Sequence, residues 1–174
     1  KTGTITTGEL QVEFIHVEEN SPYSDERSHY FAASVEQFAH HVISRSICNS
    51  YEGEPSSQVE EIQETPGRGI RGFVDNHLVH VGNHSFIDEM EINHSHELAK
   101  TKDSHIFVAI DNTLVATIAL IDTIKDEAIE TIADLKKMKI PHISIVSGDS
   151  EENVASVANQ CNIDSYYSRQ LPKD

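Results

Sequence analysis

The chain has 174 residues, which is enough for one sizeable domain or two small ones. It carries 29 acidic and 13 basic residues and a formal net charge of −16, and a surface this acidic repels phosphate backbones and argues against nucleic acid as a partner. No apolar stretch approaches the length of about 18 residues that predicts a membrane span. Cys48 and Cys161 are the only cysteines; their spacing suits no metal site, and they fit two free thiols in a reducing compartment.

The first third of the chain predicts a loop, a strand and a helix. Residues 1–8 are rich in Gly and Thr and predict a loop, and residues 11–17 alternate weakly between apolar and polar side chains, as a strand does. Residues 26–48 show three-four apolar spacing, so we expect one amphipathic helix there. Residues 56–66 have too few apolar positions to predict an element. The apolar face of the expected helix consists of Tyr30, Phe31, Val35, Phe38, Val42, Ile43 and Ile47.

Two similar segments in the middle of the chain predict β-hairpins. Residues 69–82 and 105–121 each place an Asp-Asn pair between two apolar runs, and both residue types tolerate the positive φ of a two-residue hairpin turn. Residues 85–102, between the hairpins, have the spacing of a helix. The expected turns are Asp75-Asn76 and Asp111-Asn112.

The pattern after residue 122 changes to alternating helices and strands. We expect helices over residues 126–139 and 150–162, and strands over residues 143–146 and 163–167. Helices and strands that alternate through short loops are typical of a parallel, doubly wound sheet.

Two domains follow from this order of elements. An antiparallel sheet with helices, residues 9–118, is inserted into a Rossmann-like domain made of residues 1–8 and 119–174. The predicted fold class is therefore α/β, with an antiparallel domain inserted into a parallel one.

Ser147-Gly148-Asp149 follows an expected strand and precedes an expected helix. A serine hydroxyl, a glycine amide and a helix N-terminus at the carboxyl end of a parallel strand can hold a phosphoryl group. The same residues can instead form a helix cap, with Asp149 as the cap and Glu152 three residues later in support. The spacing alone leaves both interpretations open.

Glycines stand before and at the end of the first expected hairpin. Gly67 and Gly69 would let the backbone approach a ligand closely, although most Gly-x-Gly runs are turns. Gly82 and Asn83 can likewise be a strand-ending turn or a ligand contact.

Histidines are frequent between residues 77 and 105. A metal-binding surface is one interpretation. We favour the other, a polar region in which His replaces Asn or Lys, because the i, i+4 pair His80 and His84 brackets Gly82 at an expected strand end and does not lie on a helix. The cluster comprises His77, His80, His84, His94, His96 and His105.

Several runs, taken in order, resemble the cytosolic part of P-type ATPases. Lys1-Thr2-Gly3-Thr4 resembles the stretch directly after the phosphorylated aspartate in Asp-Lys-Thr-Gly-Thr. Residues 122–128 resemble the segment in which the chain re-enters the phosphorylation domain, although Asp122 can also be a helix-capping aspartate. Residues 147–150 resemble Thr-Gly-Asp-Asn with serine at both ends, and residues 171–174 resemble the start of Leu-Pro-x-Asp-Lys.

Residues 34–43 resemble the Glu-x-x-x-x-His-Pro segment of the heavy-metal-transporting class, which is followed downstream by Gly-x-Gly, as here. In that class the Glu, the His and both glycines form the adenine end of the nucleotide site. Val42 stands where the class has Pro, which would fix the backbone beside the histidine. The resemblance implies Glu36, His41, Gly67 and Gly69 as nucleotide-binding residues, with Gly82 and Asn83 near the nucleotide.

The resemblance also implies a mechanism and a fold. ATP and Mg²⁺ would serve an aspartyl-phosphate cycle that exports copper or zinc/cadmium cations, and the phosphorylation domain would be haloacid-dehalogenase-like. Lys1 and Ser147 would contact phosphoryl oxygens, Gly148 and Asp149 would complete the phosphate loop, and the carbonyl of Thr2 would help to hold Mg²⁺. Its partners would be ATP and the membrane and actuator domains of the same parent protein, at the cytosolic face of a membrane.

Two other functions remain open. A haloacid-dehalogenase-like phosphatase with a cap domain usually carries a second aspartate two residues after its nucleophile, where this chain has Thr2. The second alternative function is that of a non-catalytic, histidine-rich metal-binding module. Under the favoured interpretation these residues alone are expected to be inactive, because the phosphorylated aspartate would precede Lys1. The transported ion would be selected in the membrane, so this sequence does not identify it.

Overall fold

A computed structural model describes residues 1–94 and 105–170. The chain forms two compact units, one made of Lys1–Glu9 and Asp122–Asp174 and the other of Leu10–Ile121. Among the residues described, no helix is both long enough and apolar enough to cross a membrane.

A six-stranded sheet dominates the larger unit, in the order β1-β6-β5-β4-β3-β2. The pairings from β2 through β6 are antiparallel. The strands are β1 (Thr6–Val17), β2 (Val59–Thr65), β3 (Gly69–Val74), β4 (His77–Gly82), β5 (His105–Ile110) and β6 (Thr113–Ile124).

Both predicted hairpins are confirmed. β3 pairs with β4 and β5 pairs with β6, each through an Asp-Asn turn. The φ angles are 51° and 66° at Asp75 and Asn76, and 48° and 67° at Asp111 and Asn112. Two consecutive residues with positive φ give a turn whose twist matches that of the flanking strands.

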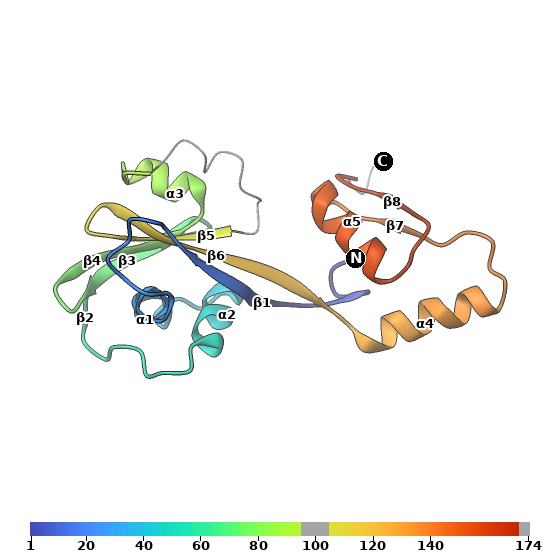
Figure 1. The fold of residues 1–174 in the computed structure, drawn as a ribbon, viewed down its shortest axis with the longest axis horizontal. Helices are drawn as coiled ribbons and strands as arrows, with labels where there is room; N and C mark the ends of the chain where they lie inside the picture. Colours follow the sequence, from blue (N-terminus) through green and yellow to red (C-terminus); the bar gives the residue numbers. More distant parts are fainter. Residues whose placement is uncertain (95–104, 171–174) are drawn as a thin grey trace. The chain divides into compact units, whose positions relative to one another are not determined.

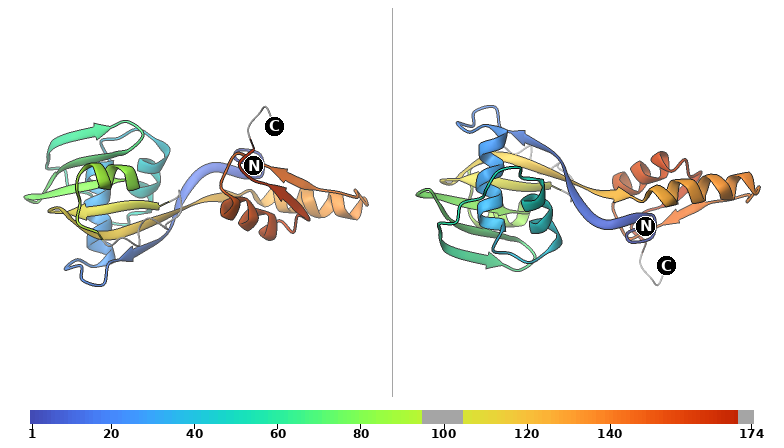
Figure 2. Two further views of the ribbon diagram at one scale, coloured as in Figure 1. Left: turned by 90° about the horizontal axis from the view of Figure 1, so that it is seen from above. Right: turned by 90° about the horizontal axis from the view of Figure 1, so that it is seen from below.

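Helices cover both faces of the sheet (Figure 1). α1 (Asp25–Glu36) and α2 (Val42–Ser50) lie on one face, and α3 (His84–Glu89) lies on the other; Figure 2 shows each face in turn. Strand β5 is buried on both sides, because Ile106 and Val108 belong to the core under α1 whereas Phe107 belongs to the core under α3. The two cores account for the nearly continuous apolar sequence of this strand.

The smaller unit contains α4 (Asp126–Lys137), β7 (Ser144–Val146), α5 (Glu151–Gln160) and β8 (Ser165–Tyr167). β7 and β8 pair in parallel, as the alternation of helices and strands predicts. The predicted α/β fold with an antiparallel sheet is therefore confirmed. The core of this unit comprises Ile132, Ile145, Val154, Val157, Ala158, Cys161 and Ile163.

The prediction of one helix over residues 26–48 is wrong, because the chain leaves the helix after Glu36 and starts a second helix at Val42. The apolar spacing continues through Phe38 and Val42, but these side chains are 44% and 39% exposed and bury little surface. His41 has extended backbone angles and caps the second helix with its side chain.

Three further boundaries differ from the expectations. Residues 1–8 were predicted as a loop, but β1 already begins at Thr6. Residues 56–66, for which no element was predicted, contain β2. The expected helix over residues 85–102 ends as α3 at Glu89, since Glu91 takes a positive φ of 52°. Residues 95–102 of that prediction, and the run 171–174, lie outside the described residues.

Candidate functional site

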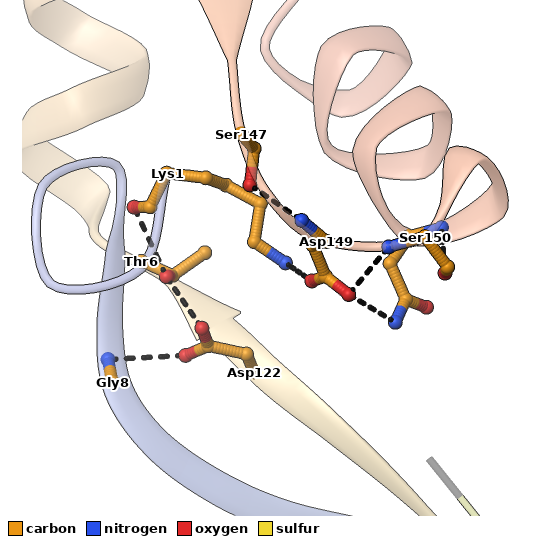
Figure 3. Close-up of polar contacts among 8 residues, drawn as sticks. Lys1, Thr6, Gly8, Asp122, Ser147, Asp149 and Ser150 are labelled. Atoms are coloured by element: carbon orange, nitrogen blue, oxygen red, sulfur yellow. Dashed lines mark hydrogen bonds and ion pairs between the residues drawn. The ribbon is translucent and has the colours of Figure 1, made fainter. Parts of the chain in front are cut away.

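In the smaller unit, Lys1 lies beside the loop that follows β7 (Figure 3). Its Nζ donates to Asp149 Oδ2 at 2.5 Å, although the two residues are 148 positions apart. The side chain of Lys1 is only 3% exposed, so its ammonium group is largely removed from water. A buried ammonium group needs a counter-charge, and Asp149 provides it.

The other carboxylate oxygen of Asp149 accepts hydrogen bonds from Ser150 N at 2.7 Å and from Asn153 Nδ2 at 3.2 Å. Partial burial by itself raises the pKa of Asp149, but the hydrogen bonds from Lys1, Ser150 and Asn153 and the charge of Lys1 outweigh burial and lower the pKa. Asp149 is therefore ionised at neutral pH. The alternative in which Asp149 caps the helix is wrong, because Ser150 is the N-cap of α5.

The loop containing Ser147 and Gly148 is held by the end of β8 and the residues that follow it. Ser147 N donates to Tyr167 O at 3.0 Å, and Gln170 N donates to Ser147 O at 2.9 Å. The Ser147 hydroxyl accepts from Asp149 N at 3.2 Å. A serine hydroxyl and an exposed glycine backbone thus lie just before the N-terminus of α5, where the peptide dipoles favour an anion.

The residues after Lys1 form a tight turn. The Lys1 carbonyl accepts from the backbone N–H groups of Thr4, Ile5 and Thr6 at 3.2, 2.9 and 3.2 Å. Thr2 is exposed in this turn. Across the described ranges, no group of three or more His, Cys, Asp or Glu side chains is arranged to hold a metal ion.

Asp122 is the centre of a second group of hydrogen bonds in the same unit. Its Oδ2 accepts from Thr6 Oγ1 at 2.6 Å and its Oδ1 accepts from Gly8 N at 3.0 Å (Figure 3). The helix-capping interpretation of Asp122 is wrong, because Lys125 is the N-cap of α4 and Asp122 lies within β6. The sequence analysis missed Thr6, which is fully buried, because 116 positions separate it from its partner.

In the larger unit, Ser44 of α2 joins Glu36 and His41. Glu36 ends α1 at 2% exposure, and its Oε2 accepts from Ser44 Oγ at 2.5 Å. His41 is exposed, and its Nδ1 accepts from Ser44 N at 3.2 Å. The expected single helix over residues 26–48 would have carried both Glu36 and His41, but Glu36 ends α1 and His41 caps α2, so the two residues belong to different elements. No sequence motif pointed to Ser44.

Burial changes the chemistry of this group. Desolvation raises the pKa of Glu36 to about 7, and repulsion from Glu64 adds to the rise, whereas the hydrogen bond from Ser44 opposes it. Burial, together with the charge of Glu36, also raises the pKa of the Cys48 thiol to about 11. Near neutral pH, therefore, Glu36 is partly protonated and Cys48 is a thiol.

The candidate glycines fall into two kinds. Gly69 and Gly82 face each other across β3 and β4. A Cβ at either position would lie 2.5 Å from Phe86 Cδ1, and at Gly69 it would also lie 2.5 Å from Val81 O, so both glycines make room for the Phe86 ring. Gly67 instead has a φ of 73° and open space around its Cβ position.

Asn83 connects these glycines to α3. Its Oδ1 accepts from Phe86 N at 3.0 Å as the N-cap, and its Nδ2 donates to Gly67 O at 3.2 Å. The structure thus brings Gly67, Gly69, Gly82 and Asn83 together at one end of β3 and β4. Glu36 and His41 form a separate group, which Ser44 joins.

The histidines of the cluster that the structure describes have different surroundings. His80 is 3% exposed, and burial, together with the positive charge of Arg71, lowers its pKa to about 4, so it is a neutral core residue. His96 lies outside the described residues. Carboxylate contacts join His77 to Asp111, and both His84 and His94 to Asp88.

A groove of about 390 Å³ lies elsewhere in the larger unit, between β1, α1 and the residues after α2. None of the candidate residues lines it. Its walls include Phe14 and Tyr51 but also Asp25, Glu26 and Glu52, and this acidic lining would repel phosphate groups.

The sequence and the fold are similar to those of known proteins. A family model described as haloacid dehalogenase-like hydrolase matches residues 1–172, so the chain belongs to that family. Within it, the chain is similar over its whole length to heavy-metal P-type ATPases. The cadmium, zinc and cobalt-transporting ATPase of Helicobacter felis is 32% identical over 174 residues, with 100% of this chain and 25% of that protein covered. A copper-transporting ATPase of the same species is 29% identical over 176 residues, covering 100% of this chain and 23% of that protein.

A solved structure shows the same arrangement of elements. The catalytic domain of a CPx-ATPase, solved to follow conformational changes upon nucleotide binding, superposes with a TM-score of 0.75 at 26% identity, covering 100% of this chain and 62% of that one. The resemblance inferred from the sequence is therefore confirmed. The chain spans about a quarter of the length of the curated relatives it matches.

Proposed function

We propose that this chain is the nucleotide-binding and phosphorylation part of a P-type ATPase that exports copper or zinc/cadmium cations through an aspartyl-phosphate. The observation that carries the proposal is the position of Lys1, whose ammonium group lies against the loop of Ser147, Gly148 and Asp149. A cation, a hydroxyl and a helix N-terminus then converge on one place, which suits a phosphoryl group. Residues 9–118 would bind the nucleotide, and residues 1–8 and 119–174 would belong to the phosphorylation domain.

The adenine end of ATP would bind near Glu36 and His41. A carboxylate can accept a hydrogen bond from the exocyclic amino group of adenine, and an exposed imidazole can hydrogen-bond to the base or stack on it. Gly67 would contribute backbone that a ligand can approach, because no atom beyond its two chain neighbours lies within 4 Å of its Cβ position. Gly69, Gly82 and Asn83 would hold this backbone in place.

The phosphate end would bind in the smaller unit. Lys1 and Ser147 would stabilise phosphoryl oxygens, and Asp149 would keep the ammonium group of Lys1 in position. The carbonyl of Thr2 would contribute to holding Mg²⁺, whose charge neutralises phosphate oxygens when it is bound. These 174 residues alone are expected to show no turnover, and the membrane and actuator domains of the parent protein would be needed for transport.

An NMR titration of the ¹⁵N-labelled chain with ATP and Mg²⁺ tests the proposal. We expect shifts around His41 and Gly67 at the lowest ATP concentrations. His41→Ala should weaken binding by about 1–3 kcal/mol if a hydrogen bond to the base is lost. His40→Ala, an exposed neighbour, is the matched control and should bind as the unmodified chain does.

The pattern of shifts decides between assignments. Shifts confined to residues 148–151 would contradict a base site near His41, although they would still support phosphate binding. Binding of Zn²⁺ or Cu⁺ without any response to ATP would favour the histidine-rich metal-binding module and would overturn the proposal.

A further inference from the structure

The contacts of Ser44 suggest a role that its position in the sequence does not reveal. Ser44 is 1% exposed and contacts both Glu36 and His41, which belong to different elements. We propose that Ser44 is a positioning residue, which holds the Glu36 carboxyl and the His41 ring in the arrangement that receives the nucleotide base. The inference rests on the proposed function and adds a residue to that site.

The contacts of Ser44 assign a donor and an acceptor to each hydrogen bond. His41 Nδ1 accepts from Ser44 N, so the proton of the neutral ring is on Nε2. Ser44 Oγ lies 3.1 Å from both Nδ1 and Nε2 of His41, so it packs against the ring, while its proton goes to Glu36 Oε2 at 2.5 Å. Ser44 therefore donates its hydroxyl to Glu36 and its backbone N–H to His41, and no apolar side chain can replace the hydroxyl at Glu36.

In the segment between the helices, Ala39 is 5% exposed and packs into the core, whereas His41 is exposed and is held mainly by Ser44. Phe38 in this segment and Val42 at the start of α2 are 44% and 39% exposed, so their packing restrains His41 less than full burial would. Glu36 is buried near Glu64 and Cys48, neither of which offers it a positive charge. The Ser44 hydroxyl is thus the group that orients one oxygen of Glu36 and stabilises its ionised form.

The chain provides a matched control in the same helix. Ser46 is 7% exposed, and within the described part of the chain its hydroxyl has no hydrogen-bond partner. Ser46→Ala therefore removes a buried hydroxyl from α2 without touching Glu36 or His41. Ser44→Thr keeps the hydroxyl, and Ser44→Cys, a weaker donor of similar size, replaces Ser44→Ala if that variant fails to fold.

The test combines two measurements on the 174-residue chain. The carboxyl ¹³C signal of Glu36 reports its titration directly, and calorimetry reports ATP affinity between pH 6 and pH 8. We expect Ser44→Ala to move the Glu36 midpoint to higher pH and to weaken ATP binding about tenfold at pH 7, as the loss of one hydrogen bond to a charged group does. Because Glu36 accepts best when ionised, the increase of affinity with pH should also move upward in this variant.

Each outcome is decisive. Ser44→Thr and Ser46→Ala should keep both the Glu36 midpoint and the ATP affinity of the unmodified chain. If Ser44→Ala leaves both quantities unchanged, or if Ser46→Ala lowers affinity equally, the positioning role is wrong although the proposed function stands. If the unmodified chain does not bind ATP, the proposed function fails, and the nucleotide role of Ser44 fails with it.

Discussion

The buried carboxyl of Glu36 makes the stability of the larger unit depend on pH in an unusual direction. Its pKa rises from 4.5 to about 7 in the folded protein, chiefly because burial disfavours the charged form. That difference corresponds to about 3 kcal/mol between the fully protonated and the fully ionised side chain. Glu36→Gln removes the titration while keeping a similar shape and an oxygen that can accept from Ser44.

The direction in which stability changes with pH follows from proton binding. A carboxyl with a higher pKa in the folded state binds its proton more tightly when folded, so ionisation costs stability. The cost is absent below pH 4.5, grows between pH 4.5 and about 7, and is constant above that range. The stability of Glu36→Gln relative to the unmodified chain should therefore increase by about 3 kcal/mol from pH 4.5 to pH 8.

Urea denaturation at pH 4.5 and pH 8 measures this difference. The transition should be followed through NMR signals of β4 and β5, which belong to the unit that contains Glu36. The other acidic groups contribute almost equally to both proteins and cancel in the comparison. Glu13→Gln, at an exposed position of β1, should show the same difference at both pH values. An equally constant difference for Glu36→Gln would refute the raised pKa.

Other regions give further tests. Gly69→Ala should destabilise the larger unit by about 3 kcal/mol, since its Cβ would overlap Phe86, whereas Gly67→Ala should cost about 1 kcal/mol for its positive φ; chemical denaturation separates the two. Asp149→Asn should cost about 2 kcal/mol at pH 7, because Lys1 loses its counter-charge. Since the pKa of Asp149 is lowered by folding, that cost should disappear as the pH falls below 3.8, and an undiminished cost in acid would contradict the ion pair. Hydrogen exchange should be faster in β7 than in the hairpin of β5 and β6, because β7 has three residues and one described partner strand; equal protection would mean that further chain covers β7.

Local chemistry made part of the fold predictable. The Asp-Asn turns need only two residues that tolerate positive φ, so both hairpins could be placed from the sequence. β2 could not be placed, because its register shifts between Glu60 and Gln63 and Glu61 takes a φ of 50°. Such a bulge interrupts the alternation of buried and exposed side chains on which strand prediction depends.

The candidate site was predictable only where a motif was continuous in sequence. Lys1 and the Ser147–Asp149 loop are each recognisable, but their contact depends on the fold that brings them together. Asp122 and Thr6 form a comparable contact, and no sequence motif around Thr6 predicts it. The sequence did not reveal the break before His41, because the apolar spacing continues through Phe38 and Val42 although these residues are 44% and 39% exposed.

The glycines show how one sequence pattern can contain two physical roles. A missing Cβ permits close approach, but the atom that approaches can belong to the protein or to a ligand. At Gly69 and Gly82 it is the Phe86 ring, which packs 2.5 Å from where either Cβ would be. At Gly67 the corresponding space is open, and Asn83 fixes the carbonyl beside it. Direct contact with a nucleotide is therefore expected at Gly67, whereas Gly69 and Gly82 would influence binding through the packing of α3 on the sheet.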